Sequence, residues 1–206
     1  MHFDQYTDGV ICSAMGIGPF EPLDDLRSIR LLLKPSFHPE LCITLHQLRL
    51  SIVALRSKLW QEPVPHDLLQ LAAAIPTIPQ HFEDTLKSFQ LAAAANAAKR
   101  PSVCVDGMPV SAIYKSTEGY LSFSGHPTSS DEICFVVNLL RLANDLAASV
   151  PLRNRISECG RYLDRSFIVE PESNLHDTTR IVVLGSPKDR TEYLAMLRAA
   201  TSKSPT

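Results

Sequence analysis

The most continuous hydrophobic pattern in the chain lies over Asp131–Ser149. Ser129, just before this segment, and Glu132, within its first turn, have the S-x-x-E spacing of a capping box. In a capping box a hydroxyl and a carboxylate satisfy backbone N–H groups at the start of a helix. Two adjacent apolar stripes leave little of such a helix free to face water. We therefore predict a central buried helix here. Its stripes are Ile133, Val136, Val137, Leu140, Ala143 and Ala147, with Phe135, Leu139, Leu142 and Leu146 beside them.

A second pattern covers Pro39–Gln61, where apolar residues recur in steps of four and three positions. This a/d spacing is typical of a helix with one apolar seam. The seam either packs against other helices of the same subunit or forms an interface between copies of the chain. Its residues are Leu41, Leu45, Leu48, Ile52, Leu55 and Leu59.

The remainder of the first half also favours helices. Pro22–Leu33 has acidic residues in its first turn, a short helix fits the run from His66 to Ile75, and Gln80–Lys99 combines an apolar face with an alanine-rich second half. We expect residues 20–100 to form a helical region. Residues 1–19 form an N-terminal arm in this interpretation, either docked on the body or partly disordered.

After Pro101 the pattern changes to short β-like runs separated by turn residues. We therefore predict an α+β fold, with residues 101–200 as an α+β region that could be continuous with residues 20–100, and 201–206 as a tail. The elements predicted around the central helix are a three-stranded meander (Ser102–Val105, Pro109–Lys115, Tyr120–Ser124), a helix (Leu152–Leu163), a hairpin (Ser166–Glu170 with Thr179–Gly185) and a final helix (Lys188–Ala200).

From residue 80 onward the expected order, α-β-β-β-α-β-β-α, loosely resembles that of dimeric secretion chaperones. The resemblance covers about half of the chain and rests on the order of the elements. It implies a small, mildly acidic protein that binds segments of a partner.

Composition limits the classes of function. The 20 basic and 22 acidic residues give a net charge of −2, whereas a dedicated nucleic-acid binder is usually clearly basic. The five cysteines are widely separated and form no C-x-x-C pair, so we expect reduced thiols, no metal site and no cofactor. With no signal peptide or transmembrane segment evident, we expect an intracellular, cytoplasmic protein.

One candidate ligand site is the predicted strand–turn–helix junction RIVVLGSPKDR. Such a turn presents N–H groups at the positive end of a helix, where a phosphate or carboxylate can bind. The P-loop pattern is absent. The alternative function this junction indicates is a small enzyme or a domain that binds an anionic ligand through Gly185, Ser186, Lys188 and Arg190.

A second candidate is the arginine-rich segment containing Arg153, Arg155, Arg161 and Arg165. Acidic neighbours at helical spacing favour a solvated face. The alternative is a contact with a membrane surface or nucleic acid, as in a matrix-type structural subunit.

Catalytic motifs are not evident, since the chain has neither G-x-S-x-G nor H-E-x-x-H. A Cys–His site would require folding to bring Cys104 or Cys134 to His126. We therefore predict a non-enzymatic protein whose function is protein–protein interaction, as an adaptor or a self-assembling structural subunit. Its expected partner is another protein or a second copy of the chain.

Overall fold

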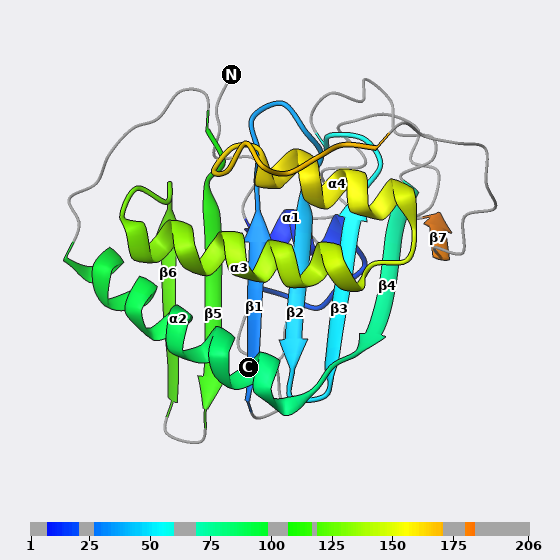
Figure 1. Cartoon of the computed structure of the whole chain (residues 1–206). Helices are drawn as coiled ribbons and strands as arrows, with labels where there is room; N and C mark the ends of the chain where they lie inside the picture. The colour runs from blue at the N-terminus through cyan, green and yellow to red at the C-terminus, as the bar shows by residue number, and fades with distance from the viewer. Residues whose placement is uncertain are drawn as a thin grey trace.

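The computed structural model describes residues 8–20, 27–59, 69–98, 107–116, 119–170 and 180–183. These residues form an α+β fold with an antiparallel sheet in the order β6-β5-β1-β2-β3-β4-β7. Figure 1 shows the sheet behind three helices. Its strands are β1 (Ser28–Leu33), β2 (Leu41–His46), β3 (Arg49–Leu55), β4 (Leu69–Pro76), β5 (Val110–Ser116), β6 (Gly119–Gly125) and the short β7 (Arg180–Val183).

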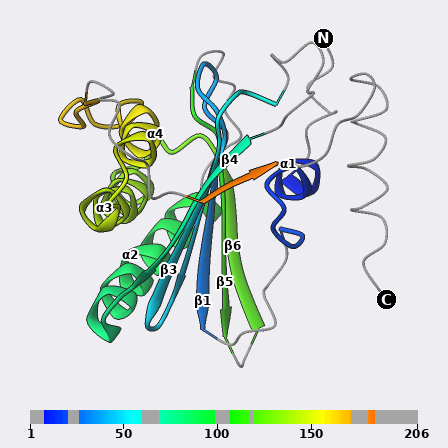
Figure 2. The same ribbon diagram turned by 90° about the vertical axis from the view of Figure 1, so that its right-hand side faces the viewer.

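The described helices lie on both faces of the sheet. Figure 2 shows α2 (Pro79–Ala97), α3 (Ser130–Leu146) and α4 (Val150–Gly160) on one face, and the short α1 (Asp8–Ala14) on the other. Strand residues alternate between the faces. Ile29, Ile43 and Ile52 therefore join the core under the three helices, whereas Leu32 and Cys42 pack with α1.

The central helix is confirmed as α3, together with its capping box. The Ser129 hydroxyl accepts from the Glu132 N–H at 3.2 Å, and the Glu132 carboxylate accepts from the Ser129 N–H at 3.0 Å. The helices predicted over Gln80–Lys99 and Leu152–Leu163 correspond to α2 and α4, and the strands Pro109–Lys115 and Tyr120–Ser124 to β5 and β6.

The prediction of a helical region over residues 20–100 is wrong for most of its length, because four strands occupy it. Pro39–Gln61 is no heptad helix but the hairpin β2–β3, in which Leu41 pairs with Ala54 and His46 with Arg49. The two-residue connection Gln47–Leu48 lacks glycine, asparagine and aspartate, so the usual signal of a hairpin turn is missing. The described parts of the helices expected at Pro22–Leu33 and His66–Ile75 are β1 and β4.

The second half also differs in one hairpin. Thr179–Gly185 contributes β7, but β7 pairs with β4 rather than with Ser166–Glu170. The latter segment is not a strand. At its end the Asn154 side chain donates to the Glu170 carbonyl and accepts from the Glu170 N–H, each at 2.8 Å. Ser102–Val105 and Lys188–Ala200 lie outside the described residues.

The order of elements after residue 80 is α2-β5-β6-α3-α4-β7 among the described residues, which differs from the order we expected there. The expected α-β-β-β-α-β-β-α order runs instead, with one additional strand, from α1 to α3. Strand β1 lies between β2 and β5, so the sheet draws on both of the regions that the sequence suggested.

The core between the sheet and the three helices is centred on aromatic rings. The Phe89 ring of α2 lies 5.7 Å from the Phe123 ring of β6 and 5.3 Å from the Phe135 ring of α3, centroid to centroid. Phe123 and Phe135 also meet edge to face at 5.7 Å. The two contacts of Phe135, with Phe89 and with Phe123, are edge to face, which suits the charge distribution of aromatic rings. Together the three contacts anchor β6 to two helices.

Candidate interaction surface

Two of the predicted site regions do not form a site among the described residues. Gly185, Ser186, Lys188 and Arg190 lie outside them. The residues of the predicted apolar seam are on strands β2 and β3 or just after them, and all but one are buried in the sheet; the exception, Leu48, is 62% exposed in the hairpin turn. The interface prediction therefore loses the helix on which it rested.

Two of the four arginines in the arginine-rich segment form ion pairs. Arg153 forms a bidentate ion pair with Glu170, with N–O distances of 2.9 and 3.2 Å. This hydrogen bonding lowers the pKa of the Glu170 carboxyl. Arg155 binds Glu158 at 2.7 Å. Arg161 and Arg165 are exposed. Two of the four arginines are therefore charge-compensated and two are exposed, and a basic contact surface on this segment stays a prediction.

Of the two cysteines considered for a cysteine–histidine site, only Cys134 is among the described residues. Cys134 is exposed on α3 and accepts a hydrogen bond from Asn138 of the same helix at 3.3 Å, and Cys104 lies outside the described residues. Three other cysteines, Cys12, Cys42 and Cys159, are buried, and burial raises the pKa of each thiol. Raised thiol pKa values oppose nucleophilic chemistry.

A buried charged pair lies near the start of β2. Glu40 and Lys58 are both inaccessible to solvent. Burial lowers the pKa of Lys58 to about 8, which the negative charge of Glu40 partly opposes, and burial raises the pKa of Glu40. The Lys58 ammonium donates to the Pro35 carbonyl, and Glu40 Oε2 accepts from the Leu59 N–H at 3.3 Å. The pair ties the β1–β2 connection to the end of β3.

The most unusual surface in the described part of the chain is the outer edge of β6. No described strand pairs with β6 on the side away from β5. Its sequence, GYLSFSG, contains neither a charged residue nor proline, although proteins usually protect an open edge with such residues. Tyr120 is 65% exposed and Leu121 is 47% exposed. The edge therefore offers both outward-facing backbone groups and apolar side chains.

The ladder defines which backbone groups of β6 are available. The Lys34 N–H donates to the Pro109 carbonyl at 2.9 Å, in register with the β1–β5 pairing. Because bonding alternates along a strand, the odd-numbered residues of β5 face β1 and its even-numbered residues face β6. The β5–β6 register places the even-numbered residues of β5 opposite the odd-numbered residues of β6, so the backbone groups of those β6 residues bond to β5. The residues whose N–H and C=O groups face away from the sheet are Tyr120, Ser122 and Ser124.

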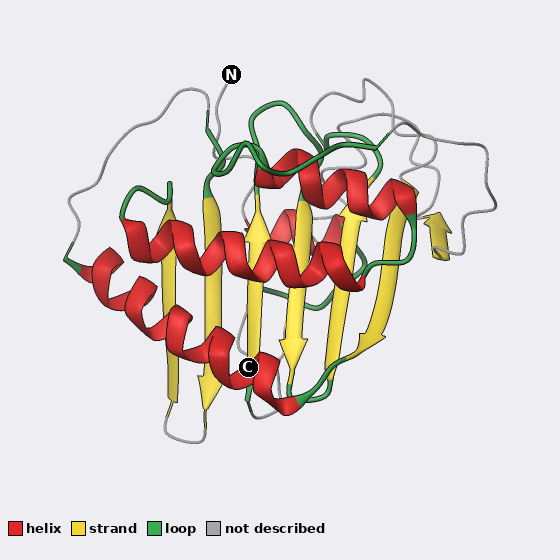
Figure 3. Ribbon diagram, in the orientation of Figure 1, coloured by secondary structure: helices red, strands yellow, loops and turns green. Residues whose placement is uncertain are grey.

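Helix α2 stands over this edge. Figure 1 shows its C-terminal turns continuing past β6, and Figure 3 shows the same helix crossing the strand in the layer in front of the sheet. Asn96 Nδ2 donates to the outward-facing carbonyl of Ser124 at 3.3 Å. Ala94, Ala97 and Ala98 are exposed on the last turns, so this end of the helix carries small side chains.

Sequence reasoning predicted β6 as a strand but missed that it ends the sheet. The sequence does show that Gly119–Gly125 lacks charged residues and proline. At an edge such a strand would be unprotected against pairing with another chain. That signal identifies a candidate edge only once the strand order is known, and the strand order depends on β1–β4, which the sequence pattern did not reveal.

Other chemistries find little support in the described ranges. None of their helices is long and apolar enough to cross a membrane. Within the same ranges, no group of three or more His, Cys, Asp or Glu side chains is arranged to hold a metal ion. No family model, no curated protein and no solved structure matches the chain.

Proposed function

We propose that this protein is a protein-binding module that takes up an extended segment of a partner protein as an additional strand beside β6. The observation that carries the proposal is the uncharged, outward-facing edge formed by Tyr120, Ser122 and Ser124. Strand addition uses backbone hydrogen bonds for affinity and alternate side chains for specificity. The exposed Tyr120 and Leu121 lie on opposite faces of the sheet and can contact alternate residues of the added strand.

The position of α2 favours a single strand over a second copy of the chain. Two copies joined antiparallel through β6 would be related by a two-fold axis perpendicular to the sheet, so both helix layers would lie on the same side. Each α2 already crosses its own β6 and extends beyond it (Figure 1), so the two helices would compete for one strip of space. One extended segment fits beneath α2 without this conflict.

A partner segment that suits this edge is short and largely uncharged. Strand β6 has seven residues, and three of them present outward-facing backbone groups. The Ser124 carbonyl is already bound by Asn96, so the available hydrogen bonds concentrate toward Tyr120 and Ser122. An apolar residue next to Leu121 would extend the aromatic core around Phe123.

The test begins with selection from a displayed library of random peptides of about ten residues, the upper length of a typical strand. Amide hydrogen exchange of the full chain is then measured with and without the best peptide. We expect protection of the Tyr120 and Ser122 amides, which face outward, and little change at Leu121, whose amide already bonds to β5.

Two outcomes would overturn the proposal. One is a selected peptide that protects amides elsewhere and leaves those of Tyr120 and Ser122 unchanged. The other is a molar mass by light scattering that shows a stable dimer, together with protection of the same two amides in the absence of peptide. In that case the edge would be occupied by a second copy.

A further inference from the structure

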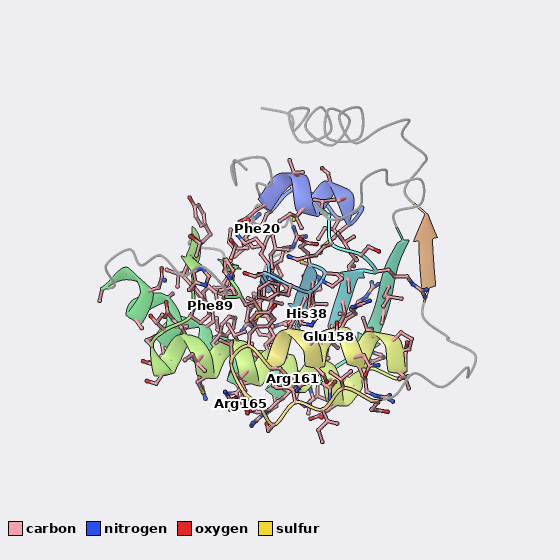
Figure 4. All side chains as sticks on the ribbon, turned by 90° about the horizontal axis from the view of Figure 1, so that it is seen from above. Phe20, His38, Phe89, Glu158, Arg161 and Arg165 are labelled. Carbon is pink, nitrogen blue, oxygen red and sulfur yellow. The ribbon has the colours of Figure 1, made fainter. Side chains whose placement is uncertain are left out.

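A small hollow at the C-terminal end of α4 is independent of the β6 edge. It has a volume of about 260 Å³ and is lined by Phe37, His38, Glu158, Arg161 and Tyr162. Two residues come from the β1–β2 connection, Glu158 comes from the last turn of α4, and Arg161 and Tyr162 follow the helix directly. Figure 4 shows His38, Glu158 and Arg161 gathered beside this part of α4.

The charges around the hollow are unequal. Glu158 is bound by Arg155 at 2.7 Å, so its negative charge is compensated. Arg141 and Arg153 are likewise paired, with Asp164 and Glu170. Arg161 lines the hollow and is exposed, and its side chain has no ion pair or hydrogen bond to another described residue, whereas its backbone N–H donates to Ser157 at 3.0 Å. The hollow therefore presents one uncompensated guanidinium.

A hydrogen-bond chain adds a second donor. The Phe37 N–H donates to the Tyr162 hydroxyl oxygen at 2.9 Å, and the same oxygen lies 3.1 Å from His38 Nδ1. With its oxygen already accepting from Phe37, the hydroxyl can donate its hydrogen to Nδ1. In the tautomer with its proton on Nε2, the imidazole then offers an N–H donor in the wall that also contains Arg161.

Aromatic surface completes the site. Phe37 is 62% exposed although it is a large apolar side chain. The His38 and Tyr162 rings meet edge to face, with centroids 5.6 Å apart and planes at 90°. Exposed aromatic walls around a few polar groups are characteristic of small-ligand sites. The volume is below the usual range for drug-sized ligands, so only a small molecule fits.

We propose that this hollow binds a carboxylate carried on a small, flat, apolar body. Arg161 and His38 hold the carboxylate, because a guanidinium and an N–H donor match its two oxygens. Phe37 covers the flat part. Of the site residues expected from the sequence, Arg161 of the arginine-rich segment lines this hollow.

The test is a titration of the full chain, followed by NMR chemical shifts, with benzoate, inorganic phosphate and benzamide as probes. We expect benzoate to bind with a dissociation constant on the order of a millimolar and to shift the signals of Phe37, His38 and Tyr162. Benzamide has the same ring without the charge and should bind at least about tenfold more weakly, as should phosphate, which lacks the ring.

Matched variants locate the binding. Arg161→Gln should weaken benzoate binding about tenfold or more, the loss expected for a charge-assisted pair. Arg165→Gln is the control, because Arg165 is an exposed arginine of the same segment that does not line the hollow. It should leave binding unchanged. Both variants change exposed side chains, so both should fold.

The proposal is overturned by absence of benzoate binding, by equal binding of benzoate and benzamide, or by phosphate binding as tightly as benzoate. Equal losses in the two arginine variants would also overturn it, since they would reveal general charge attraction rather than a site.

Discussion

The two edges of the sheet are completed in different ways. At β4 the chain adds a strand of its own, because Arg180–Val183 pairs with Leu69–Ala72. At β6 no described strand follows, and the edge contains no residue that would deter pairing. Both β6 and β7 are end strands of the described sheet, but β7 has four residues and begins with the charged Arg180, whereas β6 has seven residues and no charge. The comparison teaches that the two ends differ in length and charge, and we interpret β6 as the binding edge.

The open edge is nevertheless firmly held. Phe123 points from β6 into the aromatic core and contacts both Phe89 and Phe135. At the top of the strand, Asn96 bridges Ser124 and Glu132, the latter at 2.7 Å. A strand that is ordered before its partner arrives loses less conformational entropy on binding. Order and openness together distinguish β6 from a frayed edge.

The largest effect is expected from Phe123→Ala, which tests whether β6 is anchored as described. Removing this buried ring should lower the free energy of unfolding by about 3 kcal/mol, through lost burial and a cavity among the aromatic rings. Leu121→Ala, at a half-exposed position of the same strand, should cost about 1 kcal/mol or less. Urea unfolding measures both. Equal costs would contradict the anchoring of β6 by its ring.

A proline at the closed edge should have the next largest effect. The Thr77 N–H bonds to Leu48, so the odd-numbered residues of β4 direct their backbone groups to β3 and the even-numbered ones to β7. Val182 is paired with Gln70, so its backbone groups face β4, whereas those of Ile181 face away. Val182→Pro therefore removes a ladder hydrogen bond and should destabilise by about 1–2 kcal/mol. Ile181→Pro is the matched control and should cost less. If both cost the same, β7 does not close this edge in the register found.

The buried Glu40–Lys58 pair makes the free energy of unfolding depend on pH, and we expect this dependence to be unaffected by changes at either edge. Burial lowers the pKa of Lys58 from 10.5 to about 8, so between these values the unfolded chain holds a proton that the folded chain has released. The free energy of unfolding therefore rises with pH over this window, by at most about 1.4 kcal/mol per pH unit from this group.

Urea unfolding at several pH values from about 8 to 10 measures this slope. We expect Val182→Pro to keep it and Lys58→Met to lose the part due to Lys58. A slope that changes with Val182→Pro would show that the closed edge is coupled to the centre of the sheet, and would weaken the comparison of the edges as separate regions.

The smallest effect on stability is expected from Tyr120→Lys, which gives β6 the charge that open edges usually carry. Because Tyr120 is mostly exposed, the free energy of unfolding should change by no more than about 0.5 kcal/mol. Binding of the selected peptide should weaken severalfold. Unchanged binding by calorimetry would show that the peptide does not lie against this edge.

The part of the fold that the sequence reveals is the part with strong local signals. The capping box at Ser129 and the double apolar stripe after it determine α3 without help from the rest of the chain. The hairpin β2–β3 was missed because its inward-facing leucines and isoleucines are joined by Gln47–Leu48, a turn without glycine. Without a recognisable turn, the apolar residues of the two strands have the same spacing of three and four positions as the seam of a heptad helix.

The candidate site was harder to predict than the fold, for a physical reason. An edge is a property of strand order, which only long-range pairing defines, so β6 could be recognised as a strand but not as the last one. The hollow beside α4 depends in the same way on the docking of Phe37 and His38 against Arg161. Neither arrangement has a local signature.

The most direct test of the account compares Ser122→Pro with Ser122→Ala in binding of the selected peptide. The Ser122 N–H faces away from β5, so proline removes a donor for the partner without breaking the β5–β6 ladder, whereas alanine keeps the donor. Calorimetry should show binding lost or weakened at least about tenfold in Ser122→Pro and preserved in Ser122→Ala, with similar stability of the two. Equal binding by the two variants would contradict strand addition at β6.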